Sequence, residues 1–355
     1  MHLNTCSPSG DDAIQRANSQ PAFSQDLFEQ VLQRDNILAA WHRVRANKGA
    51  PGVDGMTIEA FPAWARSGHW KRTATELRVG QYHPAPVRRV EIDKPDGGKR
   101  QLGIPTVTDR VIQQAIAQVL TPIFDPGFSD NSFGFRPHRN GQQAVQQVQR
   151  LIKQGRGVAV DVDLSKFFDR VNHDLLMSKL GAKINDKRLL SLIGQYLRAG
   201  FIANQQHQES REGVPQGGPL SPLLANIMLD PLDKELEKRG HAFARYADDF
   251  TILVRSRRAG ERVLASISRY LQQRLKLVVN ASKSHVVKTS ESKFLGFTFK
   301  TGRILIHPNS LQRFKQQVRR LTNRNWGVAM EYQLFMVGTH LVGYHAREGK
   351  QHRQR

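Results

Sequence analysis

The chain has a single cysteine, Cys6, and no long hydrophobic run among its 355 residues. One cysteine excludes a disulfide framework and a zinc site built from cysteine ligands. The first twenty residues lack an apolar stretch of signal-peptide length. The longest apolar run, Leu223 to Leu229, is too short to span a bilayer. Internal repeats and low-complexity tracts are also missing, and we expect a cytoplasmic protein with no membrane partner.

Acidic residues are scarce relative to basic ones. The chain carries 31 Asp and Glu against 53 Lys and Arg, which gives a formal net charge of +22. A surplus of this size favours a polyanionic partner, nucleic acid before membrane, over a protein that happens to be basic. The length is sufficient for two or three lobes with a substantial core.

Local patterns predict a mixture of helices and short strands after a polar lead-in over residues 1–22. The expected helices cover 27–45, Thr108 to Leu120, Asn140 to Lys153, Ser221 to Gly240 with a kink or restart at Pro231, 260–275, and the region from Leu311 onward. The expected strands are Val87 to Ile92 paired with Arg100 to Ile104, the run 157–163, and short segments near Val278, Val286, 294–299 and 304–306. A Gly-rich stretch over 47–55 predicts an ordered loop.

The tetrapeptide Tyr246-Ala247-Asp248-Asp249 lies between two short apolar runs, 242–244 and 250–254. Two strands joined at a tight turn would present the adjacent carboxylates at a hairpin tip. Adjacent aspartates repel each other, and a bound cation relieves that repulsion. A solvated Asp-Asp turn is the alternative interpretation.

A third carboxylate belongs to a run with period-two alternation. Val158, Val160 and Val162 share one face, and Asp161 and Asp163 share the other. Asp163 is either a turn or capping residue, or a ligand that joins the hairpin aspartates in a site for two divalent cations. Such sites serve in-line phosphoryl transfer.

Several sequence blocks, taken together in their order along the chain, resemble those of a reverse transcriptase encoded by bacterial group II introns. The resemblance covers roughly residues 45 to 300. Its blocks are 47–55, the fingers block 94–110, 129–145, the first palm motif VDVDLSKFFDRVNH over 160–173, GVPQGGPLSPLLAN over 213–226, RYADD over 245–249, 277–283 and 294–297. YADD alone is weak, whereas the full order of blocks is specific.

The resemblance implies a catalytic role for Asp163, Asp248 and Asp249, which would bind two Mg²⁺ ions, with Mn²⁺ as a possible substitute. The motif does not make Asp161 a ligand. Phe168 matches the aromatic gate that selects deoxynucleotides by excluding a 2′-hydroxyl. In the alternative, both Phe167 and Phe168 belong to the core.

Further roles follow from the same resemblance. Lys94 and Arg100 match the cations that hold the triphosphate, with Lys99 as a competitor, and Gln216 matches the amide beneath the nascent base pair. Lys283 matches a proposed proton donor to pyrophosphate. The primer grip corresponds to Phe294, Leu295 and Gly296. Each role has a structural alternative. Lys94 and Arg100 would belong to an exposed basic turn, and Gln216 to an ordinary Gly-rich turn. Lys283 would be a solvated lysine, and the primer-grip residues would form a core strand with a bulge.

The implied fold is α+β, a right-hand polymerase with fingers, an antiparallel-sheet palm backed by helices, and a partial helical thumb. The expected domains are a flexible segment over 1–22, the N-terminal extension and fingers over 23–156, the palm over 157–300 with a fingers-like insertion at 182–212, and a partial thumb over 301–355. We expect the thumb and maturase region to be truncated.

The expected activity is RNA-directed DNA synthesis with an RNA template, a DNA primer, deoxynucleoside triphosphates and a group II intron RNA as partners, in the service of intron mobility. One alternative is a maturase that binds intron RNA and aids splicing without polymerising. A third interpretation is a retron, diversity-generating or defence-type reverse transcriptase.

Overall fold

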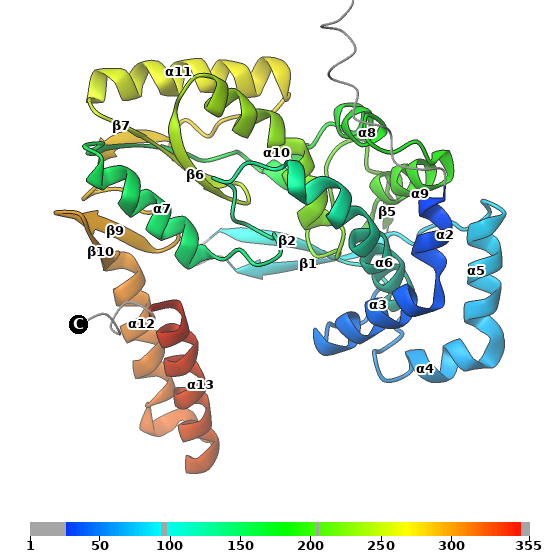
Figure 1. Ribbon diagram of the computed structural model, residues 1–355. Coiled ribbons are helices and arrows are strands. Elements are labelled where there is room, and N and C mark those ends of the chain that lie inside the picture. The colour runs from blue at the N-terminus through cyan, green and yellow to red at the C-terminus, as the bar shows by residue number, and fades with distance from the viewer. Residues whose placement is uncertain (1–25, 94–97, 204–205, 349–355) are drawn as a thin grey trace, which may run out of the picture. The chain divides into compact units, whose positions relative to one another are not determined.

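The computed structural model describes residues 26–93, 98–203 and 206–348 (Figure 1). The chain divides into two compact units. The first comprises Met1–Gly127 and Phe168–Met228, and the second comprises Phe128–Phe167 and Leu229–Arg355. The expected lead-in over 1–22 lies outside the described residues. The assignment of fingers, palm and thumb stays a prediction.

Helices make up most of the first unit. They are α2 (Leu27–Leu32), α3 (Arg34–Ala46), α4 (Phe61–Trp64), the π-helical turn Ala65–His69, α5 (Trp70–Arg78), α6 (Val107–Phe124), α8 (His173–Gly181) and α9 (Lys187–Arg198), and α10 (Ser221–Lys238) begins here. The expected single helix over 27–45 breaks at Gln33, whose ψ of 137° is extended.

Helix α6 begins earlier and ends later than its sequence signals predict. The Thr106 hydroxyl, not that of Thr108, caps it by accepting from the Asp109 N–H. Pro122 lies inside the helix rather than beyond its end. Burial of Phe124 explains the extension, because packing of the last turn compensates for the backbone donor that proline lacks.

The first unit also contains a four-stranded sheet in the order β2-β1-β4-β5. The expected hairpin is confirmed: β1 (Val87–Asp93) pairs antiparallel with β2 (Lys99–Ile104). Strand β4 (Phe201–Ala203) runs parallel to β1, and β5 (Gln206–Gln208) returns beside β4.

The second unit is built on an antiparallel sheet in the order β6-β7-β3-β8. Its strands are β6 (Ala242–Tyr246), β7 (Asp249–Val254), β3 (Val158–Val162) and β8 (His285–Lys288), and β9 (Phe297–Lys300) pairs separately with β10 (Arg303–Ile306). Its helices are α7 (Gly141–Lys153), α11 (Arg257–Arg274), α12 (Pro308–Leu321), α13 (Met330–Glu348) and the rest of α10, which passes through Pro231 without ending.

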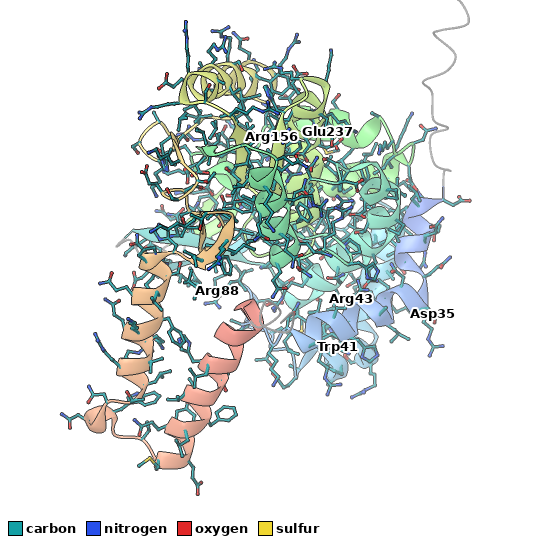
Figure 2. The ribbon with its side chains drawn as sticks, turned by 60° about the vertical axis from the view of Figure 1, so that its left-hand side comes forward. Asp35, Trp41, Arg43, Arg88, Arg156 and Glu237 are labelled. Carbon is teal, nitrogen blue, oxygen red and sulfur yellow. The ribbon has the colours of Figure 1, made fainter. Side chains whose placement is uncertain are left out.

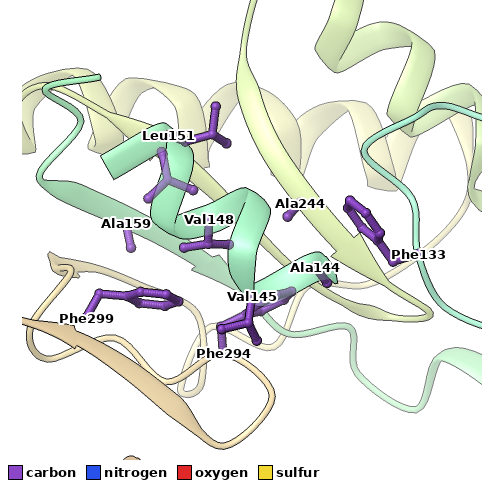
Figure 3. Packing of buried hydrophobic residues seen from close by; sticks show 10 residues of the cluster. Phe133, Ala144, Val145, Val148, Leu151, Ala159, Ala244, Phe294 and Phe299 are labelled. Atoms are coloured by element: carbon purple, nitrogen blue, oxygen red, sulfur yellow. The ribbon is translucent and has the colours of Figure 1, made fainter. Parts of the chain in front are cut away.

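Helix α7 covers one face of this sheet (Figure 3). Asn140 caps it through a capping box with Gln143, as the sequence predicts. The core here joins α7 to β3, β6 and β7, to one phenylalanine before α7 and to two further along the chain: Phe133, Ala144, Val145, Val148, Leu151, Ala159, Ala244, Leu253, Phe294 and Phe299.

Helix α11 packs against the opposite face of β3. Gly260 on this helix lies so close to Val160 and Val286 that an added Cβ would come within 2.5 Å of the Val286 side chain. Strand β3 is therefore covered on both faces, which fixes the position of the aspartate that follows it. Within the described residues, no helix combines the length and apolar character needed to cross a membrane.

Candidate active site

The tetrapeptide Tyr246–Asp249 forms the turn between β6 and β7. Tyr246 pairs with Asp249, so Ala247 and Asp248 are a two-residue loop. Ala247 has φ of +59°. A positive φ at the first loop position is typical of type II′ hairpins and usually belongs to glycine. The surrounding structure must therefore hold an alanine in a strained conformation.

A segment from 131 to 134 supports this turn from the edge of β6. The Phe133 N–H donates to the Arg245 carbonyl over 2.8 Å, and the Arg245 N–H donates to the Asn131 carbonyl over 2.8 Å. A Cβ on Gly134 would lie 2.3 Å from the Ala247 nitrogen. Only glycine permits this close approach of the two backbones.

The side chain of Arg245 fixes the turn from inside the protein. It donates to both carboxylate oxygens of Asp233, over 2.7 Å from Nε and 2.5 Å from Nη2. Its Nη1 donates to the Ala247 carbonyl over 2.9 Å. Neither side chain of the ion pair is exposed. Asp233 comes from α10, so this helix positions the carbonyl of the strained loop residue.

Asp163 directly follows β3 and lies beside the same turn. Strand β3 pairs antiparallel with β7, with Val162 opposite Phe250, and continuing this register places Asp163 opposite Asp249. The Asp163 N–H donates to Ser284 Oγ over 3.0 Å, and the Asp163 carbonyl accepts from the Asn280 N–H over 2.8 Å. The fold thus brings together the three aspartates that the sequence singled out.

The carboxylates influence each other's ionisation. Desolvation is the main cause that raises the pKa of Asp249 to about 7, and the charges of Asp161, Asp248 and Asp163 raise it further. Many protein atoms lie near the Asp249 carboxylate, although the residue itself stays exposed to solvent. A hydrogen bond from the Leu295 backbone opposes the rise. The site concentrates negative charge that a divalent cation would neutralise.

Asp161 is a fourth carboxylate that the sequence interpretation left out. One of its oxygens accepts from Ser292 Oγ over 3.1 Å, and the other lies 3.7 Å from His285 Nε2. Burial raises the pKa of Asp161. Its alternation with Asp163 along β3 was the available signal, because two acids on one face of a buried strand are unusual.

Lys283 and the expected primer grip lie in the loops around these aspartates. Lys283 is exposed in the loop 280–284 that holds the Asp163 backbone. Phe294 is buried, and it exchanges two backbone hydrogen bonds with Phe297 across a tight turn. Leu295 and Gly296 occupy that turn with φ of 51° and 90°. Phe294 is thus a core residue, and the turn backbone is what contacts Asp249.

Sequence patterns did not indicate a role for Lys293, which lies immediately before this turn. Partial burial and the nearby Arg313 lower its pKa, whereas the charge of Asp249 raises it. A lysine within electrostatic reach of the carboxylates is suited to contact a phosphate. No sequence motif distinguishes Lys293 from the other lysines of this region, because its position near Asp249 depends on the turn that follows it.

The first unit holds the remaining predicted residues that the structure describes. Phe168 and Gln216 line one hollow of about 140 Å³, together with Gln101 and Arg89. The Gly103 N–H donates to the Gln216 carbonyl over 2.7 Å, and the Phe168 carbonyl accepts from the Val214 N–H. Both phenylalanines, Phe167 and Phe168, are buried. The structure therefore brings Phe168 and Gln216 together.

The structure does not describe the side chains of Lys94 and Arg100, the two residues predicted to bind the triphosphate. Lys94 lies outside the described residues. Arg100 belongs to β2, where it pairs with Ile92, but its side chain is not among those described. The competitor Lys99 binds Glu91 over 2.7 Å at the surface. Their contact with a nucleotide stays a prediction.

The donor set of the aspartate cluster suits Mg²⁺, which prefers carboxylate oxygens. Within the described part of the chain, no three His, Cys, Asp or Glu side chains converge as ligands of a single ion. This arrangement fits Mg²⁺ nonetheless, because proteins commonly hold it through one or two carboxylates and leave the other positions to water and substrate phosphates. Asp163, Asp248 and Asp249 are the residues that would supply the ligands, one or two of them to each ion.

Comparison with known proteins gives consistent matches. The sequence profile of the family described as "Reverse transcriptase (RNA-dependent DNA polymerase)" matches residues 92–299. Protein YkfC of Escherichia coli K12 is 32% identical over 329 residues, which cover 79% of this chain and 83% of YkfC. The group II intron-encoded protein LtrA of Lactococcus lactis is 38% identical over 211 residues, or 59% of this chain.

The matched part is only 34% of LtrA, so the chain spans about a third of that relative. Among solved structures, apo telomerase from Candida tropicalis superimposes with a TM-score of 0.51 at 14% identity, over 71% of this chain and 56% of the telomerase chain. At this identity the likeness concerns the fold alone. It agrees with the mixed α+β class expected from the sequence.

Proposed function

Because this chain belongs to the reverse transcriptase family, we propose that it extends a DNA primer on an RNA template with deoxynucleoside triphosphates and two Mg²⁺ ions, for which Mn²⁺ can substitute. The family's reaction is RNA-directed DNA polymerisation on a nucleic-acid template, and the family generally uses divalent metals. The observation that carries the proposal is the meeting of Asp163 with Asp248 and Asp249 at one end of the β3–β7 pair.

In this reaction the primer 3′-oxygen bonds to the α-phosphorus, the bond to the β-phosphate breaks, and pyrophosphate leaves. When bound, the ions would activate the attacking oxygen and stabilise the leaving one. Asp163, Asp248 and Asp249 supply the negative charge that holds those ions. The raised pKa of Asp249 means that it must lose a proton to serve as a ligand near neutral pH.

The remaining roles are assigned on the same basis. Phe168 excludes the 2′-hydroxyl, and Gln216 contacts the nascent base pair, which their shared hollow supports. Lys94 and Arg100 hold the triphosphate, and Lys283 donates a proton to pyrophosphate. The primer grip Phe294, Leu295 and Gly296 positions the primer end, with the Leu295 backbone next to Asp249. These assignments rest on the motif matches and on the placement of the described residues.

We further propose the group II intron type, with intron RNA as a partner, a role in intron mobility and a cytoplasmic location. The LtrA match supports this type. So does the ordered loop over 47–55, which is attached to the first unit where Ala50 accepts from Arg110 and Pro51 accepts from Arg88. The alternative of a maturase that binds intron RNA without polymerising can coexist with polymerase activity, and the retron or defence type is the remaining alternative.

The test of the activity is primer extension on an RNA template with purified protein, Mg²⁺ and deoxynucleotides, beside the Asp248→Ala variant. The test of the intron type is binding of a group II intron RNA in competition with an unrelated structured RNA. Preference for the intron RNA supports this type, and equal affinities would contradict it. A splicing assay with Asp248→Ala would separate a maturase role from polymerisation.

A further inference from the structure

Helices α2, α3, α4 and α5 of the first unit surround a hollow of about 690 Å³. Its lining is mainly apolar and aromatic and includes Leu32, Ile37, Trp41, Phe61 and Trp70. The volume lies within the ~300–1,000 Å³ range typical of ligand sites. Trp41 is labelled on α3 in Figure 2. None of the motif residues assigned to polymerisation lines this hollow.

The aromatic rings form a continuous stacked surface. Trp41 and Phe61 stack with centroids 4.7 Å apart and an interplanar angle of 29°, and Trp70 meets Phe61 edge-on at 6.1 Å. Trp64 also stacks on Phe61, with centroids 5.5 Å apart, but it does not line the hollow. Leu38 beside them is 44% exposed, and the indoles are only half-buried. Aromatic surface left open in a concavity is typical of a binding site.

The rim of the hollow is cationic. Arg34, Arg66 and Arg78 line it, and Glu29 is the acid among the lining residues. The Glu29 carboxylate already binds two arginines, Arg188 over 3.0 Å and Arg78 over 3.5 Å. The hollow therefore suits a ligand that combines flat apolar faces with negative charge. Single-stranded RNA has both features, because its bases stack on aromatic side chains and its phosphates pair with arginine.

We propose that this hollow binds unpaired nucleotides of RNA, with a base stacked against Trp41 and phosphates held by Arg34 and Arg66. The site is separate from the aspartate cluster and would anchor RNA whether or not synthesis occurs. The choice of RNA over an acidic peptide rests on the proposed function. It also rests on the joint presence of stacked aromatic rings and an arginine rim, which matches a base and its phosphate.

The sequence offers a local probe of this site. Trp41, Trp64 and Trp70 are three of the four tryptophans, and the fourth is Trp326. In a Trp326→Phe background, all tryptophan emission reports on this part of the first unit. We would titrate this protein with a short unstructured RNA, with the abasic ribose-phosphate oligomer of equal length, and with an acidic amphipathic peptide.

We expect the RNA to quench the emission and the abasic oligomer to bind much more weakly. Arg34→Glu with Arg66→Glu should weaken RNA binding by about tenfold or more and make it less dependent on salt, because two phosphate contacts are lost. Both arginines are exposed, so these variants should fold. Arg262→Glu with Arg269→Glu, on exposed α11 surface in the second unit, is the matched charge control and should retain affinity.

Trp41→Leu should weaken binding by about five- to a hundred-fold through the loss of base stacking, whereas Trp64→Phe, outside the lining, should not. Asp248→Ala should leave this binding intact, so a failure of polymerase activity would not be mistaken for a failure of the site. Equal quenching by the abasic oligomer, quenching by the peptide alone, or unchanged affinity of the double arginine variant would each overturn the proposal.

Discussion

Arg245 and Asp233 form a two-bond ion pair with no exposed side-chain surface, directly before the Tyr246–Asp249 turn. Burial raises the pKa of Asp233, and the Arg245 charge opposes the rise. A buried pair of this kind costs desolvation energy. Here it positions a backbone carbonyl, because the same guanidinium donates to Ala247.

Breaking this pair should destabilise the protein strongly. We expect Arg245→Met to lower the free energy of unfolding by about 3–5 kcal/mol, because it leaves a buried carboxylate without its partner. Urea unfolding would measure the loss. The double variant Arg245→Met with Asp233→Leu should recover much of it, since no charge then remains buried.

The exposed pair Arg257–Glu261 is the matched control, with side chains 79% and 59% exposed. Arg257→Met should cost less than about 1 kcal/mol. If the double variant at 245 and 233 regains stability but stays inactive in primer extension, the pair acts by positioning the turn. A fully active double variant would contradict that role.

Gly134→Ala should impair catalysis more than stability. The added methyl would lie 2.3 Å from the Ala247 nitrogen and would displace the turn that carries Asp248. A displacement near 1 Å can reduce a rate by roughly 10²-fold. Primer-extension rates beside thermal melts would separate the two effects. Gly157→Ala, where an added Cβ meets nothing within 4 Å and where, as at Gly134, φ is not positive, controls for the loss of glycine freedom. Unchanged rates in Gly134→Ala would refute the argument.

The stability of the metal-free protein should depend on pH through Asp249. Its folded pKa of about 7 lies above the ordinary value of 3.8, so the folded state retains a proton that the unfolded state releases. Stability should therefore fall as pH rises between these two values, and the full loss should be present above about 7. Melting in chelator from about pH 5 to about pH 8 measures it.

Asp249→Asn isolates this contribution, because Asp161 has a raised pKa in the same direction and would remain. The melting temperature of the variant minus that of the parent should grow with pH in chelator. Added Mg²⁺ should narrow the difference, because the parent retains all three aspartates and is stabilised more than the variant. Parallel curves for the two proteins would show that Asp249 titrates normally.

Phe168→Ala should relax the choice of sugar. Phe168 lines the hollow that includes Gln216, and shortening it would leave room for a 2′-hydroxyl. We expect incorporation of ribonucleotides relative to deoxynucleotides to rise by about tenfold or more. Single-nucleotide extension with each triphosphate gives the ratio. Phe167→Ala is the neighbouring control and should lower stability without changing this ratio; an equal effect of both variants would contradict the gate.

The sequence predicted those elements whose signals lie within a few neighbouring residues. The hairpin β1–β2, the Asn140 cap of α7 and the alternation along β3 follow from turn chemistry, capping and period two. Helix ends were less predictable. Gln33 divides one expected helix into two, and Pro122 does not end another, because tertiary packing outweighs local helix propensity.

At the site, the three aspartates were predictable from motif order, and their meeting depends on strand register. The contributions of Lys293 and Gly134 were not visible, since each depends on a contact between segments far apart in the sequence. Asp161 was signalled only by its alternation with Asp163, and its effect on Asp249 depends on strand register. The same holds for Asp233, which lies in an ordinary amphipathic helix and gains its role only from Arg245.

The most direct test of the account is DNA synthesis from a primer annealed to an RNA template, measured with the parent protein and with Asp248→Ala and Asp163→Ala. The account predicts Mg²⁺-dependent, template-encoded extension by the parent. It also predicts loss of extension in both variants, with folding intact by circular dichroism. No synthesis by the parent with either Mg²⁺ or Mn²⁺, or undiminished synthesis by a folded Asp248→Ala variant, would contradict it.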